Sequence, residues 1–349
     1  MCIRDRIQIV EAAHPLPDDA GVEAAQAMLE LAKSVRKGET VVFLASGGGS
    51  ALCALPLPNV TLEQKQHATN YLLNNGANIH ELNTVRRHLS AVKGGRLAAA
   101  AHPAPVVTLA ISDVPNDLLP SIGSGPTVPD ETTSEDAIKV LETFGYPRLA
   151  ELLPTLQNPV SETLKPELPE FANDRAEVIA NSTTTLDAVT EYLKLEGYGV
   201  DRLGDHVSGD AKAVASNHAQ LVKGKLGGSD RVALVSGGET SVTIGEKSGR
   251  GGRNLEYLAE LVRLLAGDSR VSAMAADTDG IDGSSDAAGA WMEFGDLVNL
   301  AELEQAQDSH DLHTYFESRG SLIRTGPTRT NVNDLRIVLV EEPLSRTAT

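Results

Sequence analysis

Short apolar runs alternate with amphipathic stretches along most of the chain. The clearest runs are largely apolar and end at turn-forming residues, which predicts buried strands. They lie at 41–45, 106–111, 271–276 and 336–340, and we expect further strands at 7–10, 177–180, 200–203, 231–235 and 241–244. Apolar residues three and four apart predict helices at 21–35, 61–76, 83–93, 137–144, 186–197, 211–222 and 258–265. This alternation is typical of an α/β fold.

The length of 349 residues favours two domains. Between Pro147 and Glu170 the sequence has four further prolines and no sheet periodicity, so we place the boundary there. We expect one domain at 1–165 and a second at 171–345. In the second domain, the strands expected at 231–235 and 241–244 flank a short glycine turn, which predicts a hairpin-like pair.

A glycine-rich loop follows the strand expected at 41–45, and it reads Ser46-Gly47-Gly48-Gly49-Ser50. A strand, a glycine turn and the start of a helix can form an anion cradle, because free backbone N–H groups then point at the ligand. The loop matches neither the Walker pattern nor G-x-G-x-x-G, and no serine lies in G-x-S-x-G. Phosphate binding is therefore one interpretation, and a purely structural turn is the other.

Two groups of cations could face an anion. In a helix beginning at Asn83, the side chains of Arg86, Ser90 and Lys93 would share one face, although such a face could equally be exposed to solvent. Arg253 follows two glycines, and Asn254 could cap the helix that comes next. The alternative for Arg253 is a surface loop.

Carboxylates at the ends of expected strands could hold Mg²⁺ or orient a hydroxyl group. They are Asp113, Asp277, Asp279, Asp282 and Asp286. Asp277 does not begin a calcium loop, because Ala288 stands where that loop needs glutamate. Cradle, cations and carboxylates together are the parts that phosphoryl transfer requires, although each carboxylate could instead form a helix cap or an Asx turn.

Composition narrows the choice of partners. The formal charge of −18 argues against binding to nucleic acid or to anionic membranes. The two cysteines have no metal-ligand spacing, which favours a reducing cytoplasm over a disulfide framework. We find no apolar run of membrane-spanning length and no signal peptide, and we expect residues 1–6 to be a non-native tag.

Taken together, the loops resemble one family, the glycerate kinases of the MOFRL type. The motifs that carry this resemblance are 46–50, 83–90 with 93–95, 112–115, 124–127, 251–254, 278–283, 326–328 and 331–334. Their order and spacing agree from Ile7 to about Glu341. The resemblance implies ATP- and Mg²⁺-dependent phosphorylation of D-glycerate, with 2-phosphoglycerate as the product. Members often carry the label hydroxypyruvate reductase, which is the alternative, although a dinucleotide fingerprint is absent here.

The resemblance also implies an architecture and a set of site residues. It implies a Rossmann-like N-terminal domain with a parallel sheet, incomplete at its start, a smaller α/β C-terminal domain with a mixed sheet, and an active site in the cleft between them. The implied catalytic residues are Arg253, Asp113 and Asp279, and the implied metal ligands are Asp279 and Asp282. The implied substrate- and phosphate-binding residues are Ser46, Gly47, Gly48, Gly49, Ser50, Arg86, Lys93, Ser124, Gly125, Thr127, Gly238, Glu239, Asn254, Thr328, Asn331 and Asn333.

The chain departs from the family pattern in several places. The matched region starts after the strand-glycine-helix unit whose lysine is thought to be catalytic in the family, so we also weigh a non-catalytic fragment with exposed sheet surface. Arg329 and Asn116 replace expected glycines, and Leu255 replaces an expected glutamine. The sequence leaves open which hydroxyl is phosphorylated, which carboxylate holds Mg²⁺, and whether the chain forms homo-oligomers.

Overall fold

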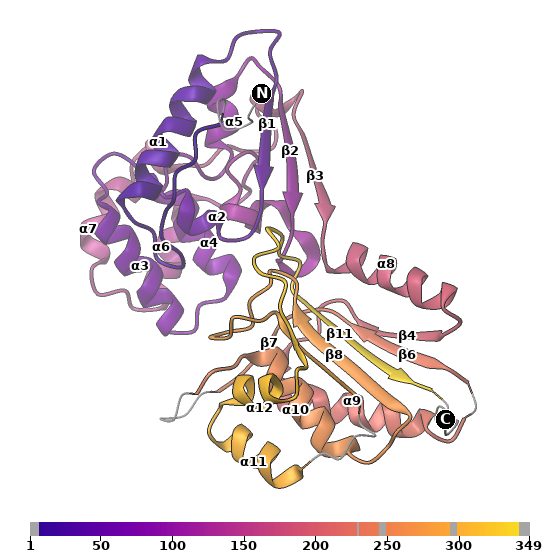
Figure 1. Ribbon diagram of the computed structural model, residues 1–349. Coiled ribbons are helices and arrows are strands. Elements are labelled where there is room, and N and C mark those ends of the chain that lie inside the picture. Colours follow the sequence, from indigo (N-terminus) through magenta and orange to yellow (C-terminus); the bar gives the residue numbers. More distant parts are fainter. Residues whose placement is uncertain (1–6, 229, 244–248, 294–298, 342–349) are drawn as a thin grey trace. The chain divides into compact units, whose positions relative to one another are not determined.

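The computed structural model describes residues 7–228, 230–243, 249–293 and 299–341 (Figure 1). The residues 1–6 and part of the strand expected at 241–244 lie outside these ranges. The chain divides into two compact units, one ending at Ile179 and the other beginning at Ala180. We call them unit 1 and unit 2. Among the described residues, no helix is both long and apolar enough to cross a membrane.

Unit 1 contains a three-stranded sheet in the order β1-β2-β3. The strands are β1 (Val41–Ala45), β2 (Val106–Ile111) and β3 (Arg175–Ala180), and β1 runs parallel to β2. The α-helices are α1 (Asp19–Ser34), α2 (Gly49–Leu52), α3 (Leu62–Asn74), α4 (Ile79–His88), α5 (Arg96–Ala101), α6 (Ser134–Thr143) and α7 (Leu149–Leu156). Helices α1 and α5 pack with β1 and β2 in one core, whereas α3, α4, α6 and α7 form another.

Strand β1 lies at the edge of this sheet and is covered on one face only. Phe43 packs in the core with α1 and α5, but the side chain of Val42 is 59% exposed and that of Leu44 is 73% exposed. The fully buried strand expected at 41–45 is therefore wrong in its burial, although its position is right. Apolar sheet surface is therefore exposed on the other face of β1.

Unit 2 contains a six-stranded mixed sheet in the order β10-β9-β8-β11-β6-β4. Its strands are β4 (Gly199–Gly204), β6 (Val232–Ser236), β8 (Val271–Asp277), β9 (Gly289–Glu293), β10 (Leu322–Ile323) and β11 (Asp334–Val340). Strand β4 runs parallel to β6, whereas the other neighbouring pairs are antiparallel. A separate ladder joins β5 (Gly209–Asp210) to β7 (Thr240–Ser241).

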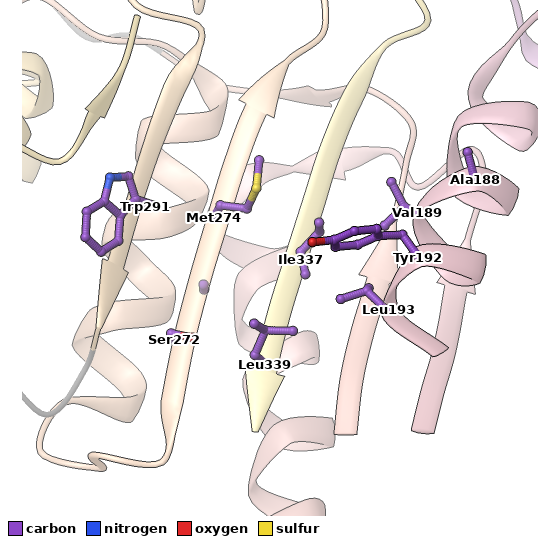
Figure 2. Close-up of a pocket in the computed structure, with 10 residues that line it drawn as sticks. Ala188, Val189, Tyr192, Leu193, Ser272, Met274, Trp291, Ile337 and Leu339 are labelled. Carbon is purple, nitrogen blue, oxygen red and sulfur yellow. The ribbon is translucent and has the colours of Figure 1, made fainter. Parts of the chain in front are cut away.

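The two faces of this sheet are covered unequally. Helices α9 (Ala211–Lys225) and α10 (Arg253–Leu265) pack on one face in the main core, joined by α11 (Leu300–Asp308) and α12 (Leu312–Ser318). Helix α8 (Ser182–Leu195) packs against β4 and β6 on the other face. Helix α8 and the strands β8, β9 and β11 line an apolar cavity of about 550 Å³. Tyr192 lies on one side of it and Trp291 on the other (Figure 2).

The structure confirms the parallel sheet in the N-terminal region and the mixed sheet in the C-terminal region. Four expectations are corrected. Residues 7–10 form no strand, and α4 begins at Ile79 with Asn78 as its N-cap, which leaves Asn83 inside the helix. Strand β6 pairs with β11 and β4 and not with β7, so the predicted hairpin is wrong.

The fourth correction concerns β3, which joins the sheet of unit 1 although the sequence placed it after the domain boundary. The proline-rich segment before it is where we placed the domain boundary. It packs instead within unit 1, where Phe171 contacts the core beside α5 and Asp174 accepts a hydrogen bond from the backbone N–H of Val106 at 2.7 Å.

Candidate functional site

Two glycine loops meet at the carboxyl end of β1. Gly48 has a φ of +78°, a conformation that favours glycine, and it turns the chain from β1 into α2. Gly123, Ser124 and Gly125 of the second loop also have positive φ. The hydroxyl oxygens of Ser50 and Ser124 lie 2.8 Å apart, and Ser124 donates to Asn83 at 3.0 Å. The serines therefore hold the loops together across 74 residues of sequence.

Lys93 fixes the same two loops from inside. Its side chain is fully buried, and its ammonium group donates to the carbonyl oxygen of Gly123 at 2.9 Å and to that of Gly49 at 3.4 Å. Burial lowers the pKa of Lys93 to about 8. Because α4 ends at His88, Lys93 does not share a helical face with Arg86, and that expectation is wrong.

A cavity of about 310 Å³ opens beside these loops. Arg86 and Asp113 contribute its charged walls, and Gly47, Gly48, Gly49 and Ser50 contribute its backbone wall. Burial lowers the pKa of Arg86 to about 10 and raises the pKa of Asp113. The remaining lining residues include His14, Thr69, Asn70, Ser121 and Gly123. A cation and a carboxylate thus share a space suited to a small polar molecule.

Several predicted binding residues of unit 1 do not line this cavity. They are Ser46, Lys93, Ser124, Gly125 and Thr127. Thr127 is buried and its hydroxyl lies 2.7 Å from that of Thr108 on β2, which indicates a packing role. Ser124 and Lys93 shape the cavity through the loop contacts described above.

In unit 2, Arg253 is surrounded by three carboxylates. It is the first residue of α10. Its Nε donates to Asp334 at 2.9 Å, its Nη2 to Asp277 at 2.5 Å, and its Nη1 lies 2.8 Å from Glu239. Burial alone would lower the pKa of Arg253, but these carboxylates raise it overall. The guanidinium is therefore charged and held in one orientation.

Asp277 and Asp334 form the buried side of this cluster. Burial raises the pKa of Asp277 to about 7, against the opposing effects of a backbone N–H and of Arg253. Asp334 also accepts hydrogen bonds from Asn254 at 2.8 Å and from the buried Arg336. Neither Asp334 nor Arg336 was predicted from the sequence as a site residue. The signal for Asp334 was present, since it closes the last of the motifs that carry the family resemblance.

Asp282 anchors α10 from a distant loop. It is fully buried, and its two carboxylate oxygens accept hydrogen bonds from the backbone N–H groups of Asn254 and Leu255, both at 3.0 Å. Burial raises the pKa of Asp282 to about 6. Asn254 itself lies inside the helix and Gly252 is the N-cap, so the capping role expected for Asn254 belongs to Asp282.

Asp279 lies beside the cluster on the loop after β8. Its carboxylate accepts a hydrogen bond from the backbone N–H of Ile281 at 2.7 Å, and its own N–H donates to Asp277 at 3.1 Å. Within the ranges that the structure describes, no group of three or more His, Cys, Asp or Glu side chains is arranged to hold a metal ion.

The other predicted binding residues of unit 2 shape the loops around Arg253. Thr328 donates to the carbonyl of Thr278 at 2.5 Å, and Asn331 accepts from the N–H of Asn333 at 2.9 Å. Gly238 has a φ of +92°, and a Cβ there would lie 2.2 Å from the backbone nitrogen of Val207. Gly238 is therefore required for packing.

Arg329 and Asn116, which replace the expected glycines, both adopt left-handed conformations. Their φ values are +63° and +62°. These conformations favour glycine, so each non-glycine residue carries a cost of about 1 kcal/mol.

Comparisons with known proteins agree along most of the chain. Residues 2–156 match a domain of unknown function, DUF4147, and residues 232–334 match the MOFRL family. The D-glycerate 2-kinase of Thermotoga maritima is 38% identical over 346 residues, which cover 96% of this chain and 81% of that protein. A protein of Agrobacterium vitis with the provisional name hydroxypyruvate reductase is 40% identical, with coverage of 96% and 78%.

A solved structure shows the same fold. The crystal structure of glycerate kinase from Thermotoga maritima superposes with a TM-score of 0.86 at 37% sequence identity, and the match covers 96% of this chain and 81% of that chain.

Proposed function

The chain belongs to the glycerate kinase family, and from this premise we propose that it transfers the γ-phosphoryl group of ATP to D-glycerate to give 2-phosphoglycerate. It is an enzyme of that family. The proposal assigns substrate binding to the cavity of unit 1 and the handling of phosphoryl charge to the Arg253 cluster of unit 2. We also propose a cytoplasmic setting, which the free buried thiol of Cys53 suits.

The cavity beside the glycine loops carries the substrate assignment. Its volume of about 310 Å³ leaves room for a three-carbon acid, and Arg86 supplies the cation that a carboxylate needs. Asp113 lies in the same cavity, and its raised pKa makes it a stronger base than an ordinary aspartate. In the proposed reaction the glycerate hydroxyl gives its proton to Asp113, and its oxygen forms the new bond to the γ-phosphorus as the bond to ADP breaks.

Arg253 would stabilise the charge that develops on the transferred group. A preorganised guanidinium needs no reorientation during the reaction, and the carboxylates around Arg253 provide that fixation. When bound, Mg²⁺ would neutralise charge on the phosphate oxygens. Mg²⁺ is commonly held by one or two carboxylates together with the phosphates, and Asp279 suits this role better than Asp282, whose oxygens both serve α10.

A coupled assay tests the activity. We expect ADP to form only when ATP, Mg²⁺ and D-glycerate are all present, and ³¹P NMR spectroscopy should identify 2-phosphoglycerate against an authentic standard. Oxidation of NADH on addition of hydroxypyruvate, without ADP formation, would instead establish the reductase.

The same assay tests Asp113. We expect Asp113→Asn to lower kcat about 10²–10⁴-fold, the usual contribution of a general base, with a smaller change in the KM for glycerate. The matched control is Asp19→Asn, which alters an exposed aspartate in the first turn of α1. An unchanged kcat in folded Asp113→Asn would remove Asp113 from the reaction.

A further inference from the structure

The three carboxylates around Arg253 differ sharply in exposure. The side chains of Asp334 and Asp277 are 0% and 4% exposed, whereas that of Glu239 is 57% exposed. Nε and Nη2 of the guanidinium are therefore committed to buried partners, and Nη1 alone is paired with a carboxylate that solvent reaches. In the described part of the chain, Arg253 is the one ion-pair partner of Glu239.

We propose that Glu239 is a built-in counter-ion, which an incoming phosphate group displaces from Nη1 of Arg253. The proposal rests on the proposed function, because it takes Arg253 as the residue that meets the phosphoryl donor. Glu239 is thus a specificity-determining residue, and its exchange for phosphate accompanies binding.

Charge explains why the exchange at Nη1 would favour the phosphoryl donor over glycerate. A glycerate carboxylate that replaced Glu239 would exchange one monoanionic carboxylate for another, with little net gain. A terminal phosphate carries more charge and three acceptor oxygens, so it forms stronger charge-assisted hydrogen bonds with the same nitrogen. Glu239 would therefore keep Arg253 from binding the carboxylate of the acceptor substrate.

The cost of breaking the pair should be modest. Solvent screens the exposed carboxylate of Glu239, so its pair with Nη1 is weaker than the two buried pairs. Displacement of Glu239 also moves a negative charge away from the incoming phosphate. The buried partners Asp277 and Asp334 would continue to hold the guanidinium in position, so phosphate would meet a cation that is already oriented.

Calorimetric titration with inorganic tripolyphosphate tests the exchange directly and needs no turnover. We expect Glu239→Gln to bind tripolyphosphate about 3–10-fold more tightly than the unmodified chain, from the loss of both the competing pair and the repulsion. Malonate, a dicarboxylate, should measurably inhibit tripolyphosphate binding to Glu239→Gln but not to the unmodified chain. The matched control is Glu302→Gln, because Glu302 is 59% exposed and pairs with Arg319 at 3.3 Å in the same unit.

Arg253→Lys separates the two proposals. If this folded variant binds tripolyphosphate as well as the unmodified chain does, Arg253 does not meet phosphate and its role in the proposed function fails. If Arg253→Lys weakens binding but Glu239→Gln leaves it unchanged or weaker, the counter-ion role alone is overturned. If Glu302→Gln also binds tripolyphosphate more tightly, the tighter binding of Glu239→Gln reflects only the change in net charge. That result would also overturn the counter-ion role of Glu239. In the double variant that combines Arg253→Lys with Glu239→Gln, the tighter tripolyphosphate binding produced by Glu239→Gln alone should disappear.

Discussion

Buried ionisable side chains are held in particular charge states by their immediate surroundings. His218 is a clear case, because it lies against α10 with its Nδ1 2.9 Å from the hydroxyl oxygen of Tyr257. Burial, together with the nearby positive charge of Arg336, lowers the pKa of His218 to about 4. His218 is thus neutral in the folded chain at pH values where an exposed histidine is protonated.

This shift predicts a loss of stability in acid. Between pH 6.5 and 4 the unfolded chain binds a proton at His218 that the folded chain does not, so the free energy of unfolding rises with pH across this window. We expect the contribution of His218, at most about 3 kcal/mol, to be complete above pH 6.5 and to be lost as the pH falls towards 4.

Urea unfolding of the unmodified chain and of His218→Gln at several pH values measures this contribution. Glutamine keeps a hydrogen-bonding group near Tyr257 but does not titrate in this range. The difference in free energy of unfolding between the two chains should change between pH 4 and 6.5. The other titrating groups are the same in both chains, so their contributions cancel in this difference. A difference independent of pH would contradict the assignment.

The position of a site residue was predictable where its sequence neighbours indicate it. Arg253 stood out because glycines precede it and a periodic helix follows, and the structure places it at the start of that helix. The inward direction of Lys93 was not predictable, because its partners are carbonyl groups of Gly49 and Gly123, 44 and 30 residues away. Contacts of this range follow from the fold and leave no local pattern.

At the scale of elements, α10 shows how a helix can be correctly predicted and its cap missed. The apolar periodicity around Leu258 and Leu261 predicted the helix, and both residues are fully buried. The acceptors for its first N–H groups come from Asp282, which follows β8 in the sequence. A cap supplied by another segment has no spacing rule, so local capping patterns pointed to Asn254 instead.

Asp282→Asn tests whether this carboxylate is structural. Asparagine keeps one acceptor oxygen and loses the other along with the charge, so we expect the free energy of unfolding to fall by about 1–3 kcal/mol. Chemical unfolding should give the same loss with and without EDTA. The control Asp308→Asn, at the exposed end of α11, should change stability by less than about 0.5 kcal/mol.

A loss of stability at Asp282→Asn that appears only when Mg²⁺ is present would contradict the capping role. It would instead support the metal ligation that the family resemblance implied for Asp282.

At the scale of the whole molecule, the α/β class was predictable, because the order of apolar runs and helices is typical of α/β proteins. The mixed sheet of unit 2 was expected only from the family resemblance. The order of strands was not predictable. Strand β11 lies between β8 and β6, and β9 was missed entirely. Its sequence, Gly289–Glu293, includes Gly, Ala, Trp, Met and Glu, which alternate too little to signal a strand.

The uneven covering of the unit 2 sheet predicts a spectroscopic result. Trp291, the single tryptophan of the chain, is 47% exposed at the apolar cavity (Figure 2). We expect acrylamide to quench its native fluorescence, and caesium to quench it more than iodide does, because the net charge of −18 repels anions. Trp291→Phe is the control and should have no tryptophan emission. Unquenched, blue-shifted emission would mean that this face is covered in solution.

The central position of β11 bears on how the protein is made. Ribosomes synthesise the chain from its N-terminus, so β4, β6, β8 and β9 emerge before β11, which lies between β8 and β6 in the sheet. Until Asp334–Val340 is synthesised, β6 and β8 have no shared neighbour, and Arg253 lacks Asp334. Nascent unit 2 should therefore remain open and accessible to chaperones until its synthesis is almost complete.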